Sequence, residues 1–354
     1  MKTRTLLVDT NFLIKRSQFG AKNVFTSKFG DIGILFSSMM KIRELIRKYA
    51  INKTILVFDG DQGGKSRYLL DPAYKSTRKS KNWHNKIELS EAEILREQEK
   101  EFSLLKNKTR LQSYAEDLFI RQISANEVEA DDIIAAYCIK HCNDESIKIY
   151  TNDRDYSQLL SLDGNNIEIL FDNIPEPITK SNYYFHFGIT YKNALTVKII
   201  CGDKSDNIKG IEGIQVDTLL KLFPDIEFKY MSVREICMKA KEINEDRIKN
   251  KMKPLKCLEN LLNNKERLIL NHKLMNLHEP FLNDEAIEAL EQLDCPLSDE
   301  NRGSKNLYKM MVEDEFLSVY NGNFVNYVEP FYTVIAYEQQ LLKEYYKAVK
   351  NNIT

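Results

Sequence analysis

Acidic residues recur in this 354-residue sequence at the ends of short apolar runs and at a predicted helix start. Gathered in one cleft, so many like charges would repel, and several would stay protonated unless cations neutralised them. Hard cations such as Mg²⁺ or Mn²⁺ suit carboxylate oxygens better than a thiolate-preferring metal does. Two such ions about 4 Å apart cleave phosphodiesters, because one helps to activate water and the other stabilises the departing oxygen. The candidate ligands are Asp9, Asp59, Glu129, Asp131, Asp132, Asp153, Asp155, Asp203 and Asp206.

Three apolar runs, at 5–8, 54–58 and 147–151, are expected to position these acids as parallel strands. The first two are predicted to be buried and the third to lie nearer an edge. Helical patterns at 31–50 and roughly 88–118 lie between them, which predicts an α/β fold with a mostly parallel sheet. In open parallel sheets the ligand site lies beyond the carboxyl ends of the strands. The acids that follow these runs should therefore meet at one edge of one sheet.

A further acidic group, Glu129, Asp131 and Asp132, precedes the apolar pattern IIAAYCIKHC and is expected to open a helix. Carboxylates are favoured at helix starts by the dipole and by free N–H groups, so capping explains any one of them. Capping does not explain three together beside the other acidic strand ends.

The segment GDKSDNIKGIEGI, residues 202–214, places glycines directly after two of the candidate ligands. A two-metal phosphohydrolase acting on small molecules would share the acids, whereas this turn points to nucleic acid. Glycine permits close backbone approach and presents N–H groups at a helix start. The pattern resembles the helix-hairpin-helix phosphate clamp, which grips duplex DNA through its backbone without reading bases. We expect Lys209, Gly210 and Gly213 to contact DNA.

Charge is distributed unevenly, although the formal net charge is only −1. Residues 65–86 carry seven Lys or Arg against one Asp, and residues 237–257 carry seven against three acids. A basic segment beside an acidic centre suits a polyanionic ligand, although a solvated charged loop explains most basic runs taken alone.

Composition indicates a folded protein with 43% hydrophobic and 29% charged residues. We expect no membrane span, an intracellular location and reduced cysteines. The sequence becomes helical and rich in Lys and Glu near residues 195–205, without a long linker. This change predicts two domains that pack together, at 1–200 and 201–354.

Six motifs occur in order between roughly residues 4 and 222: LLVDTN, VFDGD, AYKSTR, VEADD, TNDRD and GDKSDNIKGIEGI. Together they resemble the structure-specific 5′ nuclease family, which includes flap endonucleases, the 5′-nuclease domain of bacterial DNA polymerase I, and bacteriophage 5′ exonuclease and RNase H enzymes. The resemblance implies a PIN-like domain, a helical arch at about 75–112, and a helical C-terminal region with the hairpin clamp at about 202–222. It is greatest to the bacteriophage enzymes, which suggests a bacteriophage origin. We expect a monomer in the cytoplasm, which is the host cytoplasm if the protein is phage-encoded.

The same resemblance implies roles for individual residues. Asp59, Glu129 and Asp131 are expected nearer one Mg²⁺ ion, and Asp153, Asp155, Asp203 and Asp206 nearer the other, with Asp9 and Asp132 acting partly through water. Mn²⁺ is expected to substitute. Lys75 and Arg78 match a basic pair that contacts the scissile phosphate and stabilises its developing charge. Arg67 and Tyr74 are further expected DNA contacts, and Trp83 is expected to stack on bases or to pack within the arch.

The sequence departs from the family pattern at the hairpin, where Gln215 and Asp217 replace the usual Gly and Lys. We therefore expect a weaker grip on duplex DNA than in other family members.

Near the C-terminus, residues 339–346 (QQLLKEYY) fit the pattern by which replication proteins dock into sliding clamps. An ordinary amphipathic helix produces the same spacing.

These observations predict a Mg²⁺-dependent 5′ nuclease that acts on 5′-flap, nicked or branched DNA, with RNA–DNA hybrid as a further substrate. Two alternatives stay open: a PIN-type ribonuclease, which shares the acidic sheet edge but usually lacks the hairpin, and a non-catalytic protein that binds DNA junctions.

Overall fold

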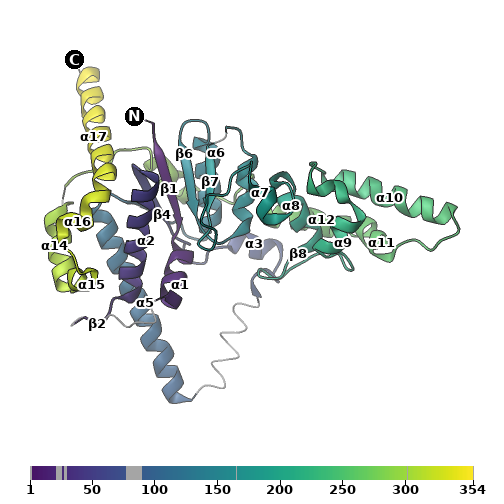
Figure 1. The fold of residues 1–354 in the computed structure, drawn as a ribbon, viewed down its shortest axis with the longest axis horizontal. Coiled ribbons are helices and arrows are strands. Elements are labelled where there is room, and N and C mark those ends of the chain that lie inside the picture. Colours follow the sequence, from purple (N-terminus) through teal and green to yellow (C-terminus); the bar gives the residue numbers. More distant parts are fainter. Residues whose placement is uncertain are drawn as a thin grey trace.

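The computed structural model describes residues 2–20, 26–27, 30–76, 90–164, 166–300 and 302–353. Its centre is a five-stranded sheet of order β5-β4-β1-β6-β7, in which every pair of neighbours is parallel (Figure 1). This sheet confirms the predicted α/β class. The strands are β1 (Arg4–Asp9), β4 (Lys53–Val57), β5 (Arg121–Ile123), β6 (Ser146–Tyr150) and β7 (Ile167–Leu170).

The third apolar run, predicted to lie nearer an edge, forms β6, which is next to the edge strand β7 but is not an edge strand itself. The alternation of apolar and polar residues in β6 has a cause other than an edge position. Lys148 of β6 forms an ion pair with Glu168 on β7, so a charged side chain is satisfied inside the sheet. The edges are the short strands β5 and β7.

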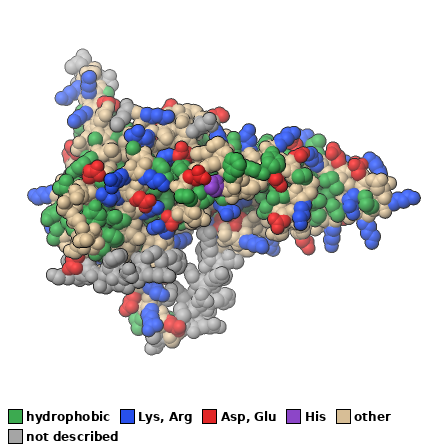
Figure 2. Space-filling view, in the orientation of Figure 1, with side chains coloured by type: hydrophobic (Ala, Val, Ile, Leu, Met, Phe, Trp, Pro, Cys, Tyr) green, Lys and Arg blue, Asp and Glu red, His purple; other side chains and the backbone are tan. Residues whose placement is uncertain are grey.

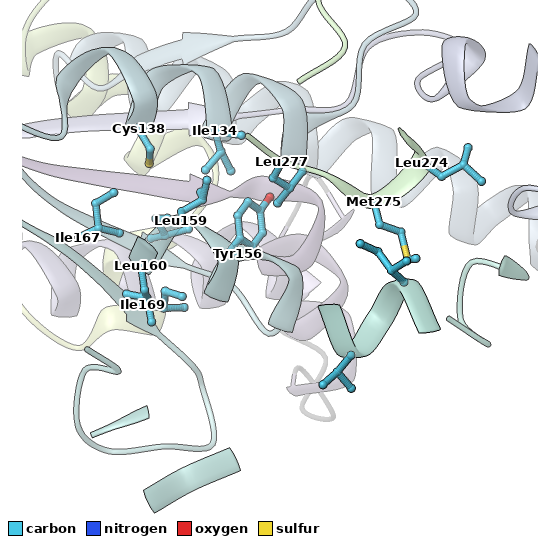
Figure 3. Packing of buried hydrophobic residues seen from close by; sticks show 14 of the residues in the cluster. Ile134, Cys138, Tyr156, Leu159, Leu160, Ile167, Ile169, Leu274, Met275 and Leu277 are labelled. Carbon is cyan, nitrogen blue, oxygen red and sulfur yellow. The ribbon is translucent and has the colours of Figure 1, made fainter. Parts of the chain in front are cut away.

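Apolar side chains of the strands alternate between two hydrophobic layers, as a pleated strand requires. Leu6 and Val8 of β1 join the layer that contains α2 and α5, whereas Leu7 joins the layer on the opposite face. Figure 3 shows part of the second layer, where Ile134 and Tyr156 pack near Leu277. The helices next to the sheet are α1 (Thr10–Gly20), α2 (Gly33–Tyr49), α3 (Lys65–Leu70), α5 (Glu91–Asp117), α6 (Ala130–His141) and the 3₁₀ helix η1 (Arg154–Ser161).

A helical extension projects away from the sheet toward the right of Figure 1. It contains the antiparallel hairpin of β8 (Gly202–Asp203) and β9 (Ile208–Lys209). Lys and Arg side chains are frequent over its outer end in Figure 2, in keeping with the basic run 237–257. The other elements are α7 (Tyr183–Phe187), η2 (Tyr191–Asn193), α8 (Ala194–Cys201), α9 (Val216–Leu222), η3 (Pro224–Glu227), α10 (Val233–Lys249), α11 (Lys256–Asn263) and α12 (Lys265–Met275).

After α13 (Asp284–Gln292), the chain returns to the sheet side of the molecule. Side chains such as Leu307, Phe316 and Phe331 share a hydrophobic layer with α2, α5 and β1. The predicted division at residue 200 stays a prediction, and this packing favours grouping the last helices with the sheet. They are α14 (Ser304–Glu313), α15 (Phe316–Tyr320), α16 (Phe324–Val328), η4 (Glu329–Phe331) and α17 (Tyr332–Ile353).

The two short strands β2 (Thr26–Ser27) and β3 (Gly30–Asp31) form a separate antiparallel pair. Within the described ranges, no helix is long and apolar enough to cross a membrane. The predicted arch at 75–112 is described from residue 90 onward by α5, whereas Arg78 and Trp83 lie outside the described residues.

Candidate active site

A cleft of about 340 Å³ lies beyond the carboxyl ends of β1, β4 and β6. Six of the nine predicted ligands line it, and they come from five separate segments of the chain. Lys75 is a further lining residue. The six acids are Asp9, Asp59, Glu129, Asp131, Asp153 and Asp206.

Backbone geometry fixes several of these carboxylates. Asp9 ends β1 and accepts hydrogen bonds from the Phe12 N–H at 3.0 Å and from the Thr151 hydroxyl at 3.1 Å. Asp59 follows β4 and accepts the N–H of Ala130, the first residue of α6, at 2.9 Å. A free N–H at a helix start favours a negative charge, so the start of α6 helps to orient Asp59.

The carboxylates that face the cleft raise one another's pKa values. Burial raises the pKa of Asp9 to about 6, and the charges of Asp59 and Asp153 add to this rise. Burial also raises the pKa of Asp131 well above its usual range, and Asp153 and Asp9 raise it further. The Tyr156 hydroxyl donates to Asp131 at 2.6 Å. A cation in the cleft would relieve this repulsion, so the donor set fits a hard divalent ion.

The Lys75 ammonium places a positive charge in the cleft. Its ammonium contacts Glu129 and lies 3.9 Å from Asp206. Burial opposes a charge on Lys75, but Glu129 and Asp206 outweigh that effect and raise its pKa. The Lys75 N–H also donates to the Asp206 carbonyl at 2.8 Å. The segment before the arch is therefore tied directly to the loop that carries Asp206.

The other three predicted ligands lie outside this cleft and are held by basic side chains. Asp132 pairs with both arms of the Arg67 guanidinium, at 2.5 and 2.9 Å. Asp155 and Asp203 share the Lys198 ammonium, with 2.7 Å between Lys198 and Asp203. Although burial acts to raise it, Lys198 and Ser205 lower the pKa of Asp203 to about 2. Asp155, Lys198 and Asp203 line a neighbouring pocket of about 280 Å³.

In the described part of the chain, no three acidic, histidine or cysteine side chains are already gathered as a metal-binding group. The ion pairs above provide a reason. Lys75, Arg67 and Lys198 each form ion pairs with two of the predicted ligands.

The hairpin turn has the geometry that its glycines predict. A Cβ added at Gly210 would lie 2.1 Å from the Cys201 carbonyl oxygen, so only glycine fits there. Gly213 has a φ of +84°, in the left-handed region that favours glycine. Ile211 and Ile214 are buried and anchor the turn. The side chain of Lys209 is exposed, which is compatible with its predicted contact to DNA.

Comparison with known proteins identifies the family. The model of the 5′-3′ exonuclease N-terminal resolvase-like domain matches residues 4–186, more than half of the chain. The chain belongs to the 5′-3′ exonuclease family. It is 27% identical over 296 residues to the 5′-3′ exonuclease of Mycoplasmopsis pulmonis, covering 82% of this chain and 90% of that relative. The Bacillus subtilis 5′-3′ exonuclease is 34% identical over 115 residues, 32% of this chain and 38% of the relative.

Solved structures place the family fold over almost the whole chain. T5 5′-exonuclease with bound zinc superposes with a TM-score of 0.58 and 22% identity, covering 89% of this chain and 99% of that one. The bacteriophage T5 flap endonuclease in a complex with DNA and metal ions gives a TM-score of 0.57 at 20% identity, over 90% and 100% of the two chains. The predicted family and fold are thus confirmed.

The predictions that Arg67 and Tyr74 contact DNA are wrong, because both side chains are buried. Arg67 is only 4% exposed, and its guanidinium is used by Asp132, Glu129 and the Leu274 carbonyl. Tyr74 is 6% exposed and donates its hydroxyl to Glu129 at 3.0 Å. Both side chains therefore contact the carboxylates from within the protein and are too buried to contact DNA.

Sequence reasoning missed Lys198 and Tyr156, which hold predicted ligands. Lys198 lies in the last turn of α8, five residues before Asp203, and that spacing was the available signal. Tyr156 follows Asp155 directly, yet its contact is with Asp131 on another helix. No local pattern in the sequence could have identified that contact.

Proposed function

We propose that this member of the 5′-3′ exonuclease family is a divalent-metal-dependent nuclease that hydrolyses phosphodiester bonds in 5′-ended or branched DNA. The observation that carries the proposal is the cleft that six carboxylates from five segments line together with Lys75. A protein that only binds DNA gains nothing from buried, mutually repelling carboxylates beside a polyanion.

We further propose which residues would hold two Mg²⁺ ions. Asp59, Glu129 and Asp131 form one group, and Asp153, Asp155, Asp203 and Asp206 form the other, with Asp9 and Asp132 acting partly through water. The pKa values of Asp9 and Asp131 support this assignment, because burial and the neighbouring carboxylates raise them and a divalent ion beside these groups would favour their charged forms. When bound, the ions would supply an activated water and stabilise the leaving oxygen. Mn²⁺ is a chemically suitable replacement.

The chain's own side chains would bind and orient the substrate. The Lys75 ammonium lies between two acidic segments, where it can contact the non-bridging oxygens of the scissile phosphate. Arg78, outside the described residues, is proposed to join it. Lys209 and the backbone at Gly210 and Gly213 would hold the duplex phosphates. The Lys75 N–H is hydrogen-bonded to the Asp206 carbonyl, and Asp206 precedes this turn by a few residues. The residues proposed to hold the duplex are therefore connected directly to a residue proposed to act in cleavage.

The relatives support this substrate class. The Mycoplasmopsis pulmonis relative is a 5′-3′ exonuclease, and the T5 flap endonuclease was solved with DNA and metal ions. A PIN-type ribonuclease would share the acidic sheet edge, but the hairpin between α8 and α9 favours a DNA nuclease.

The test is cleavage of labelled 5′-flap, nicked, single-stranded and RNA–DNA substrates in Mg²⁺, Mn²⁺ or EDTA. We expect cleavage of the flap in either metal and none in EDTA, with Asp153→Asn as the inactive control. The comparison among substrates would rank exonuclease against endonuclease activity and DNA against hybrid. Tight flap binding without cleavage of any substrate in Mg²⁺ would instead support the non-catalytic alternative.

We also propose a sliding-clamp contact through residues 339–346, which lie on α17 with Tyr345 52% and Tyr346 56% exposed. Deleting residues 337–354 would be a poor test, because it removes Glu338, which is buried in an ion pair with Arg121. The sharper variant is Tyr345→Ala with Tyr346→Ala. We expect it to abolish clamp binding in a pull-down while leaving the melting temperature unchanged, and retained binding would reject the contact. The expected monomeric state and phage origin stay predictions.

A further inference from the structure

Two lysines of this chain lie where the proposed ions would bind, and they differ in position. Lys75 lines the cleft, beside Glu129 and Asp206. Lys198 comes from α8, and its ammonium bridges Asp155 of η1 and Asp203 of β8. Asp155 and Asp203 are proposed ligands of the same ion. One positive charge of the chain therefore already contacts two of the four carboxylates of the second ligand group.

The neighbouring contacts make this bridge a defined arrangement. The Asp155 N–H donates to the Asp153 carboxylate at 2.8 Å, and Asp203 accepts the N–H and the hydroxyl of Ser205 at 2.7 and 2.6 Å. All three side chains of the bridge are largely shielded, with exposed fractions of 25% for Lys198, 17% for Asp155 and 13% for Asp203. Shielding from water strengthens such contacts and makes an unpaired carboxylate costly.

We propose that Lys198 is the resident counter-ion of the second metal subsite: it positions Asp155 and Asp203 in the metal-free protein, and a divalent ion must displace it to bind there. This inference rests on the proposed metal dependence. Its consequence is that the second ion binds more weakly than the carboxylate count predicts. Charge-assisted contacts of this kind change an equilibrium by roughly ten- to a hundredfold.

The test is Mn²⁺ binding by isothermal titration calorimetry to the full chain and to Lys198→Met, which removes the charge but keeps most of the volume. We expect two Mn²⁺ ions in the wild type and tighter binding of the weaker ion in the variant, by about tenfold or more. In EDTA the variant should melt at a lower temperature, and excess Mn²⁺ should remove that difference. Lys198→Arg keeps the charge and should behave like the wild type.

Lys239→Met is the matched control, because Lys239 forms a 2.6 Å ion pair with Asp225 on the surface of the helical extension. We expect it to change neither Mn²⁺ affinity nor the melting temperature in EDTA. Unchanged or weaker Mn²⁺ binding by Lys198→Met would overturn the inference while leaving the proposed function intact. If the wild type bound no Mn²⁺ at all, the proposed function itself would fall.

A second measurement uses the wild type alone and so does not depend on a variant that folds. Acetylation of lysines by an amine-reactive reagent, followed by mass spectrometry, reports how free each ammonium is. We expect Lys198 to react slowly in EDTA and several-fold faster with saturating Mn²⁺, with Lys239 constant in both. A Lys198 that stays protected in saturating Mn²⁺ would show that the ion does not displace it, which contradicts the proposal.

Discussion

Replacing Lys75 by alanine is expected to slow single-turnover cleavage of a 5′-flap substrate by about 10²–10³-fold, the usual effect of removing a charged group that stabilises a developing oxyanion. The substrate Kd should change much less. Lys75 is well placed for this role, because the carboxylates around it keep its ammonium protonated and its backbone is fixed to the Asp206 carbonyl. A group fixed in this way contributes most when charge builds up on the phosphate.

The measurement is a rapid-quench time course in Mg²⁺, with the Kd obtained from fluorescence anisotropy in EDTA. Lys65→Ala is the matched control, because Lys65 pairs with Glu127 at the surface and does not line the cleft. It should leave the cleavage rate unchanged. A Lys75→Ala variant that loses affinity but cleaves bound substrate at the normal rate would assign Lys75 to binding alone.

Replacing Arg121 by methionine is expected to lower the free energy of unfolding by about 3–5 kcal/mol, the usual cost of leaving a buried charge without its partner. Arg121 of β5 is 2% exposed and Glu338 of α17 is fully buried. The guanidinium contacts both carboxylate oxygens, at 2.7 and 2.5 Å, and donates to the carbonyls of Leu293 and Cys295. Without it, Glu338 stays in the interior and loses the ion-pair partner that the structure describes.

Urea unfolding followed by circular dichroism measures this loss. The double variant Arg121→Met with Glu338→Met should recover much of the stability, since it removes both charges and keeps apolar volume. Lys140→Met is the control: its 2.5 Å pair with Asp294 is partly exposed, so we expect a change of about 0–1 kcal/mol. A double variant as unstable as the single one would mean that the two carbonyl contacts of Arg121 dominate.

The acidic sheet edge could be predicted because its cause is local. Asp9 and Asp59 directly follow apolar runs, and the carboxyl ends of parallel strands meet at one edge. The hairpin could be predicted for the same reason, because Gly210 and Gly213 meet conformational demands of their own turn.

The partners of the acids could not be predicted, because they come from distant parts of the chain. Arg67 looked like part of a basic surface run, but it is the one residue of α3 that turns into the interior, toward Asp132 and Glu129. Its Nε also reaches the Leu274 carbonyl, 207 positions away. Periodicity within a six-residue helix is too short to reveal such a contact.

The return of α14–α17 to the sheet has a consequence for synthesis of the chain. Leu6 and Val8 of β1 lie in a layer that Leu307, Phe316 and Phe331 help to complete. Translation at about 5–20 residues per second delivers those later residues roughly 15–60 s after β1. Throughout that interval one apolar face of the nascent sheet is incompletely covered. The nascent chain is then most prone to aggregate and to bind chaperones.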